Sequence, residues 1–123
     1  MKAILFILVL MPALVFAQQQ KKVLTPQEFK MKSGEKTAVI LDVRTPEEYA
    51  EGHLENAVNK NVFDKDFATY MSTLGKDKTY FVYCLAGKRS HIAANDMRKK
   101  GLTVYELDGG IENWKDRKLP VIK

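Results

Sequence analysis

A short apolar run that ends at the chain's single cysteine constrains the fold more than any other stretch. Residues 80–83 are aromatic and aliphatic, and Cys84 follows them directly. A short connection containing Gly87 comes next, and a helical pattern begins near Ser90. Strand, tight loop and helix in this order are typical of open parallel α/β sheets, which bind ligands at the carboxyl ends of their strands. The sequence therefore predicts a thiol where such folds hold their ligands.

The residues around Cys84 favour a reactive thiolate. Loop N–H groups and the positive end of the next helix would point at the sulfur, as in anion-binding nests. Lys88 and Arg89 would add positive charge beside it. A lone cysteine is more often an inert core residue, and the sequence alone keeps that alternative open.

The first 17 residues predict a secretory signal peptide. Lys2 precedes an apolar stretch that Pro12 interrupts, and small residues stand before a cut ahead of Gln18. The uninterrupted apolar run is shorter than the ~20 residues of a membrane span. This favours cleaved export over a membrane anchor, so we expect a periplasmic or secreted protein with no membrane span after cleavage.

The remaining chain is expected to form one domain. Residues 18–22 predict a flexible polar lead-in, and residues 23–123 have the length of one modest domain. The net charge is +5, but the lysines are mixed with acidic residues and form no stripe interleaved with aromatic residues. This distribution disfavours nucleic-acid binding.

Strand and helix signals alternate along the domain. Residues 37–44 form the nearly continuous apolar run expected of a central parallel strand. Thr45 and Glu48 follow it as a capping box that starts a helix, and Thr25 and Glu28 form an earlier box of the same kind. The alternation predicts the α/β class with a mainly parallel sheet.

Two further helices are expected from amphipathic spacing. Asp64 is predicted to cap a helix that places Phe67 and Met71 on its apolar face. The helix after the cysteine is expected to run from about Ser90 to Lys100. Its predicted inward positions are Ile92, Ala93 and Met97.

Four segments match, in order, the pattern of one known family: residues 41–49, 52–59, 84–94 and 107–114, the last including Gly109, Gly110 and Trp114. In these segments the chain resembles single-domain rhodaneses, in particular the small exported thiosulfate sulfurtransferases of bacteria. The resemblance implies a rhodanese-like α/β fold, with a five-stranded mainly parallel sheet and helices on both faces. It covers nearly all of residues 23–119.

The resemblance also implies a chemistry. Cys84 matches the family nucleophile, which takes a sulfane sulfur from thiosulfate or a similar anion and passes it to cyanide or a thiol. No cofactor or metal is implied, and we expect a monomer that acts on small sulfur-containing anions, with a thiol or protein as a further acceptor. Asp42 and Arg44 match a supporting pair at the rim, for which a structural role is favoured. The residues expected to bind the substrate are Leu85, Ala86, Gly87, Lys88, Arg89 and Ser90.

Two alternatives remain open from the sequence. The family's larger thiosulfate enzymes carry a basic residue where this chain has Ala86, which keeps open a non-enzymatic persulfide carrier that docks to a partner of the cell envelope. Related phosphatases and arsenate reductases have five residues between cysteine and arginine, whereas four separate Cys84 from Arg89. This shorter loop ranks phosphate chemistry below sulfur transfer.

Glu48 is expected to act as a helix cap, His53 as a packing residue and His91 as a solvent-facing one.

Overall fold

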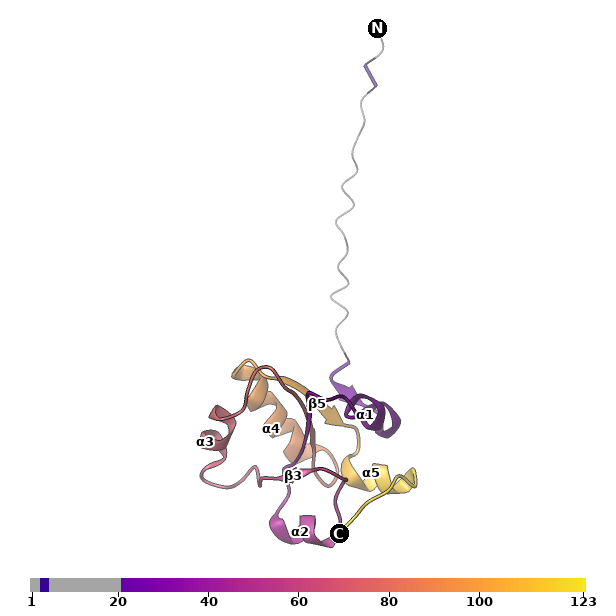
Figure 1. Cartoon of the computed structure of the whole chain (residues 1–123), viewed down its shortest axis with the longest axis vertical. Coiled ribbons are helices and arrows are strands. Elements are labelled where there is room, and N and C mark those ends of the chain that lie inside the picture. Colours follow the sequence, from indigo (N-terminus) through magenta and orange to yellow (C-terminus); the bar gives the residue numbers. More distant parts are fainter. Residues whose placement is uncertain (1–2, 5–20) are drawn as a thin grey trace.

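The computed structural model describes residues 3–4 and 21–123. They form a five-stranded sheet in the order β1-β5-β4-β2-β3, and every neighbouring pair is parallel (Figure 1). The expected rhodanese-like α/β architecture is thereby confirmed. The signal peptide predicted for residues 1–17 falls almost entirely outside the described residues and stays a prediction.

Strands and helices alternate as the sequence predicts. The strands are β1 (Val23–Leu24), β2 (Ala38–Asp42), β3 (Val58–Asn59), β4 (Thr79–Tyr83) and β5 (Thr103–Leu107). The helices are α1 (Pro26–Lys32), α2 (Pro46–Glu51), α3 (Phe67–Ser72), α4 (Lys88–Lys99) and α5 (Gly110–Asp116).

Helices cover both faces of the sheet, each over its own apolar core (Figure 1). Side chains alternate across β4, so that Tyr80 and Val82 enter the core under α3 and α4. Phe81 and Tyr83 enter the core under α1 and α5. The central strand is therefore buried on both faces, as its unbroken apolar run predicts.

Both predicted capping boxes form. Thr25 accepts a hydrogen bond from the Glu28 amide, and the Glu28 carboxylate accepts one from the Thr25 amide. Thr45 and Glu48 make the same reciprocal pair at the start of α2. These local bonds satisfy amides that a helix start would otherwise leave without partners.

Three details of the helix predictions differ from the structure. Asp64 does not cap α3, which begins three residues later at Phe67, although the Asp64 carbonyl accepts from the Phe67 amide. Ile92 is 42% exposed because the face of α4 that packs on the sheet is formed by Ala93, Ala94 and Met97. Helix α4 also begins two residues earlier than expected, at Lys88.

The last residues of the chain return to the loop after α2. The His53 amide donates to the Ile122 carbonyl at 2.8 Å, and the Ile122 amide donates back at 2.9 Å. In addition, the Trp114 indole N–H donates to the Pro120 carbonyl at 3.0 Å. The C-terminal segment is thus held by hydrogen bonds at Pro120 and at Ile122.

The loop after Cys84 rests on the start of α5. The amides of Ile111 and Glu112 donate to the carbonyls of Cys84 and Leu85, at 2.9 and 3.1 Å. Such close approach needs a glycine at position 110, whose φ of +62° is also unfavourable for other residues. A β-carbon there would lie 2.6 Å from the Cys84 carbonyl oxygen.

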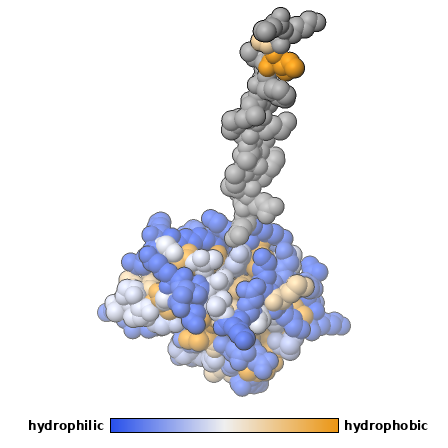
Figure 2. All heavy atoms as spheres, turned by 45° about the horizontal axis from the view of Figure 1, so that its top comes forward, coloured by the Kyte–Doolittle hydropathy of each residue, from blue (hydrophilic) through white to orange (hydrophobic). Residues whose placement is uncertain are grey.

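The face of the molecule shown in Figure 2 is largely hydrophilic, with apolar side chains scattered over it. Among the described residues, no helix combines the length and apolar character needed to cross a bilayer.

Because Gly110 has a positive φ and lies against the backbone of the Cys84–Leu85 segment, replacing it should lower the stability of the protein and displace that segment. We expect Gly110→Ala to lower the free energy of unfolding by about 2–4 kcal/mol, from the positive φ and the backbone clash together. Urea denaturation measures this change. Gly34→Ala is the matched control, because its β-carbon would meet the Met31 carbonyl oxygen at an ordinary 3.4 Å. Equal stability of the two variants would contradict the argument.

Candidate active site

The sulfur of Cys84 lies at the carboxyl end of the central strand, where the sequence predicts it. The residue is only 1% exposed. The Gly87 amide donates to Sγ at 3.1 Å, and Sγ donates to the Ser90 hydroxyl oxygen at 3.4 Å. The Ser90 hydroxyl in turn donates to the Gly87 carbonyl at 3.2 Å. The thiol therefore has two polar contacts at the start of α4, while its side chain also packs in the apolar core under α3 and α4.

The loop around this sulfur, residues 84–87, is called the Cys84 loop below. Gly87 adopts a φ of +112° and forms the N-cap of the 12-residue helix α4. This conformation turns the Gly87 amide toward the sulfur. Of the amides predicted to surround the sulfur, Gly87 provides the one that hydrogen-bonds to it among the described residues, and the Ser90 hydroxyl is its second polar contact.

The rim of the site is formed by exposed side chains. Leu85 is 39% exposed, and Ala86 and Lys88 are exposed as well. Lys88 makes no ion pair with any residue that the structure describes. Of the predicted substrate-binding residues from Leu85 to Ser90, Gly87 and Ser90 contact the buried sulfur. Leu85, Ala86 and Lys88 are exposed, and Lys88 is the one exposed cation among these six residues.

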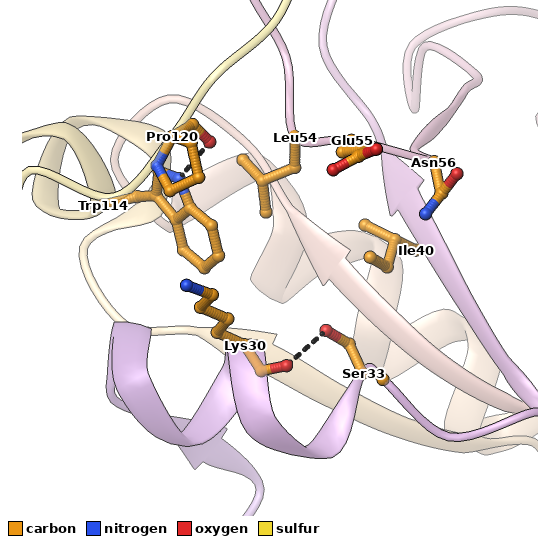
Figure 3. A pocket seen from close by; sticks show the side chains of 9 residues that line it. Lys30, Ser33, Ile40, Leu54, Glu55, Asn56, Trp114 and Pro120 are labelled. Atoms are coloured by element: carbon orange, nitrogen blue, oxygen red, sulfur yellow. Dashed lines mark hydrogen bonds between the residues drawn. The ribbon is translucent and has the colours of Figure 1, made fainter.

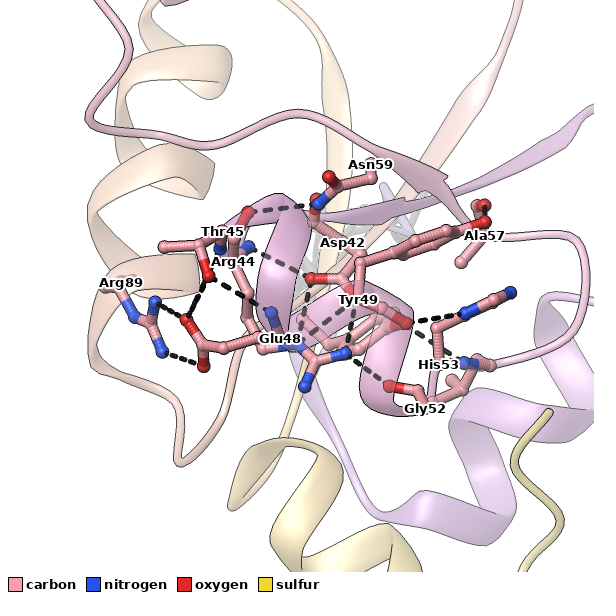
Figure 4. Close-up of polar contacts among 12 residues, drawn as sticks. Asp42, Arg44, Thr45, Glu48, Tyr49, Gly52, His53, Ala57, Asn59 and Arg89 are labelled. Carbon is pink, nitrogen blue, oxygen red and sulfur yellow. Dashed lines mark hydrogen bonds and ion pairs between the residues drawn. The ribbon is translucent and has the colours of Figure 1, made fainter. Parts of the chain in front are cut away.

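Arg89 forms an ion pair that the sequence did not predict. Its two terminal nitrogens bind the two carboxylate oxygens of Glu48, at 2.7 and 2.9 Å (Figure 4). The Arg89 hydrogen bonds lower the pKa of Glu48 from its ordinary 4.5 to about 2. The same bonds raise the pKa of Arg89, with smaller electrostatic contributions from Cys84 and Asp42. Glu48 therefore both caps α2, as expected, and holds the arginine at the site.

Asp42 and Arg44 form the buried structural pair that the sequence favoured. Arg44 Nη2 lies 2.7 Å from Asp42 Oδ2, and Arg44 Nε lies 3.0 Å from Oδ1. The same Nη2 donates to the Gly52 carbonyl at 2.8 Å, which links the strand end to the end of α2 (Figure 4). Neither residue hydrogen-bonds to Cys84. The pair instead fixes the end of β2 relative to the end of α2.

Tyr83 also belongs to this hydrogen-bond network. The sequence shows it only as one aromatic residue of a buried strand, so this role could not be predicted. Its hydroxyl donates to Asp42 Oδ2 at 2.7 Å and accepts from the Leu54 amide at 3.1 Å. Burial, followed by the charge of Asp42, raises the pKa of Tyr83, so the phenol stays protonated and can donate. Tyr83 directly precedes Cys84 and therefore ties the Cys84 loop to the Asp42 network.

Neither histidine contacts the sulfur. The His53 ring stacks on Tyr49, with centroids 3.6 Å apart, and its Nδ1 lies 2.9 Å from the Tyr49 carbonyl oxygen (Figure 4). His91 is exposed, as expected, but its Nδ1 lies 2.8 Å from Glu106. Glu106 also binds Arg98 at 2.9 Å. Both histidines therefore have structural partners.

Two cavities bear on where a ligand could enter. One of about 190 Å³ lies between α1, the loop after α2 and α5 and is lined by Lys30, Leu54 and Trp114, among others (Figure 3). No residue of the Cys84 loop lines it. A second cavity, of about 250 Å³, is lined by Ala86 and Gly87 and so adjoins the Cys84 loop. This second cavity also borders α4 and β5 through His91 and Glu106, but Cys84 itself does not line it.

Removing the Tyr83 hydroxyl should destabilise the protein. In Tyr83→Phe the buried Leu54 amide loses its acceptor, which costs about 1–3 kcal/mol. Tyr80→Phe is the matched control, because the Tyr80 hydroxyl donates to the carbonyl of exposed Gly75, which can bind water instead. Thermal unfolding should show the larger loss for Tyr83→Phe, and the reverse order would refute this role.

The Glu48–Arg89 pair should make stability depend on acid pH. Because the folded pKa of Glu48 is about 2, below its ordinary 4.5, the ionised carboxylate stabilises the fold above pH 4.5. This contribution is lost as the pH falls from 4.5 toward 2. Glu48→Gln should therefore lose less stability than the unmodified protein across that window, as measured by urea denaturation at each pH.

Glu28→Gln is the control for this prediction. The pKa of Glu28 is also lowered to about 2, mainly by its hydrogen bond from Lys21, but that pair is exposed. About 0.5 M salt should suppress the Glu28 effect more than the Glu48 effect, because exposed pairs are screened more strongly. Equal screening of both would argue against a partly shielded Glu48–Arg89 pair.

Comparison with known proteins identifies the family of this chain. Residues 25–117 match the rhodanese-like domain family. An uncharacterized protein, YqhL of Bacillus subtilis, is 34% identical over 110 residues, covering 89% of this chain and 84% of the relative. The tRNA sulfurtransferase of Pyrobaculum aerophilum is 37% identical over 87 residues, covering 71% of this chain but 18% of the relative.

A further relative matches over part of its length, and a solved structure matches over most of its length. A probable molybdopterin-synthase adenylyltransferase of Porphyra purpurea is 41% identical over 76 residues, which are 62% of this chain. This chain spans 20% of that relative. A rhodanese-related protein of Thermoplasma volcanium superimposes with a TM-score of 0.74 and 28% identity, covering 82% of this chain and 97% of the other. Given its fold, its cysteine loop and these matches, the chain belongs to the rhodanese-like domain family.

Proposed function

We propose that this protein is a sulfurtransferase that carries a sulfane sulfur as a persulfide on Cys84. The observation that carries the proposal is the sulfur's position at the end of β4, where the Gly87 amide and the Ser90 hydroxyl contact it. Family membership and relatives named as sulfurtransferases support sulfur transfer at this general level.

The loading step is an exchange at sulfur. The Cys84 thiolate attacks the outer sulfur of thiosulfate or a similar donor, and a new S–S bond forms as the donor's S–S bond breaks. The leaving group, sulfite in the case of thiosulfate, departs with the bonding electron pair. The Gly87 N–H is a donor beside the resulting negative charge, and a fixed donor of this kind stabilises an anion well in a buried site.

The unloading step returns the enzyme to its starting state. A thiophilic acceptor, cyanide or a thiolate, attacks the outer sulfur of the persulfide, and the S–S bond breaks toward Cys84. The bonding pair stays on the Cys84 sulfur, which is again a thiolate. The low exposure of Cys84 favours partners that present a narrow terminal atom.

Phosphate chemistry fits the arrangement less well. Four residues separate Cys84 from Arg89, and the Arg89 guanidinium is already engaged by both oxygens of Glu48. A bound phosphate would have to compete for the same two nitrogens. One structural neighbour, from Rhodopseudomonas palustris, is titled a possible tyrosine phosphatase and is 25% identical, so hydrolysis of an aryl phosphate is a useful negative assay.

A persulfide carrier that delivers sulfur to a partner protein is a second candidate. The uncharged Ala86 at the rim favours it, because a small anionic substrate gains no charge partner there. Rapid turnover with cyanide would favour the enzyme, whereas stable persulfide without turnover would favour the carrier. The predicted leader adds the proposal that either activity operates outside the cytoplasm, in the periplasm or secreted.

Mass spectrometry tests the central proposal directly. Incubation with thiosulfate, cysteine persulfide or inorganic polysulfide should add about 32 Da, one sulfur atom, to the sole thiol of the protein. Cys84→Ser should gain nothing under the same conditions and should unfold at a similar temperature. If none of the three donors adds sulfur to the folded, reduced protein, the proposal is wrong.

A further inference from the structure

The positive charge of Arg89 is largely neutralised by the carboxylate of Glu48. Its guanidinium binds both oxygens of Glu48, and the two side chains are only 21% and 27% exposed. Burial on this scale screens the pair less than a surface ion pair. The low pKa of Glu48, about 2, means that the carboxylate is ionised throughout the neutral range.

The charge that remains near the sulfur is small. Lys88 is the one exposed cation of the rim, and its ammonium is solvated. Ala86 contributes no charge, and the Gly87 amide and Ser90 hydroxyl contribute only dipoles. The wall of the cavity beside the Cys84 loop carries His91, Glu106 and Asp108. Glu106 is bound by His91 and also by Arg98, which lies outside the cavity wall. The cavity beside the Cys84 loop therefore has no excess of positive charge.

Possible sulfur donors differ in the charge that they bring to this site. Loading from thiosulfate follows Cys–SH + S₂O₃²⁻ → Cys–SS⁻ + HSO₃⁻, so the reacting groups carry two negative charges throughout. Loading from an alkyl persulfide follows Cys–SH + RSS⁻ → Cys–SS⁻ + RSH, with one negative charge throughout. In the second reaction the S–S bond of the donor breaks, its inner sulfur takes the bonding pair and the thiol proton, and the outer sulfur moves to Cys84.

The geometry points to Glu48 as a specificity-determining residue that, by neutralising Arg89, makes the site select singly charged persulfide donors over the thiosulfate dianion. Glu48 acts through Arg89 and touches no reacting atom, so it is a positioning residue. This inference rests on the proposed persulfide chemistry of Cys84 and names the class of its donor.

Glu48→Gln is a clean test because it removes the charge while keeping the cap. Glutamine serves at this position of a capping box as glutamate does, so α2 should form normally. Arg89 would then carry an uncompensated positive charge next in sequence to Ser90, whose hydroxyl contacts the sulfur. The rate constant for adding one sulfur to Cys84 is measured by mass spectrometry in single turnover, with thiosulfate and with 2-hydroxyethyl persulfide, whose only charge is on its terminal sulfur.

We expect the unmodified protein to load faster from the persulfide than from thiosulfate. Glu48→Gln should speed loading from thiosulfate about tenfold relative to loading from the persulfide at low salt. About 0.5 M salt should shrink this gain. Glu28→Gln is the matched control, since Glu28 occupies the same place in the α1 capping box but pairs with Lys21 instead of Arg89. It should leave both rate constants unchanged.

Ala86→Lys provides an independent second variant. Ala86 is exposed at the rim and has an ordinary negative φ, so a lysine there adds one cation without altering the cap of α2. It should shift the donor preference toward thiosulfate in the same direction. It also keeps the inference testable if Glu48→Gln does not fold.

The outcomes separate this inference from the proposed function. An unmodified protein that prefers thiosulfate, or a preference unchanged in both folded variants, would overturn the role of Glu48 while leaving persulfide chemistry intact. If neither of these donors, nor cysteine persulfide, nor inorganic polysulfide loads the unmodified protein, the proposed function itself fails.

Discussion

A buried carboxylate, Asp42, fixes the edge of the sheet at which the site lies. A fully buried charge is tolerated only when it is paired and hydrogen-bonded. The Asp42 carboxylate forms an ion pair with Arg44 and accepts a hydrogen bond from the Tyr83 hydroxyl. Arg44 also binds the end of α2, and Tyr83 binds the loop beyond it. Since Cys84 follows Tyr83 directly, the position of its sulfur depends on a network that never touches it.

Most of the fold could be predicted because its signals are local. Each capping box involves residues three positions apart, and each buried strand shows as one apolar run. One error arose where a helix packs on the sheet. Ile92 was predicted to face inward, but the small side chains of Ala93 and Ala94 let α4 approach the sheet along their own stripe, which leaves Ile92 at its edge. Hydrophobicity alone does not distinguish these neighbouring stripes.

The candidate site could be predicted only in part. The place of Cys84 and the Asp42–Arg44 pair follow from strand ends and from short spacings along the chain. The pairing of Glu48 with Arg89 joins residues 41 positions apart, through two helices that come together only once the sheet has formed. The sequence shows Glu48 as a cap and Arg89 as a cation of the loop. Their mutual neutralisation, and hence the modest charge of the site, becomes visible only in three dimensions.

The return of the chain's end to the loop after α2 has a practical consequence. The reciprocal hydrogen bonds between His53 and Ile122 fasten residues next to Gly52, whose carbonyl holds Arg44. Proline at position 122 would remove the amide that donates to His53 and would therefore loosen the backbone next to Gly52, although Ile122 itself is exposed and lies far from Cys84 in the sequence.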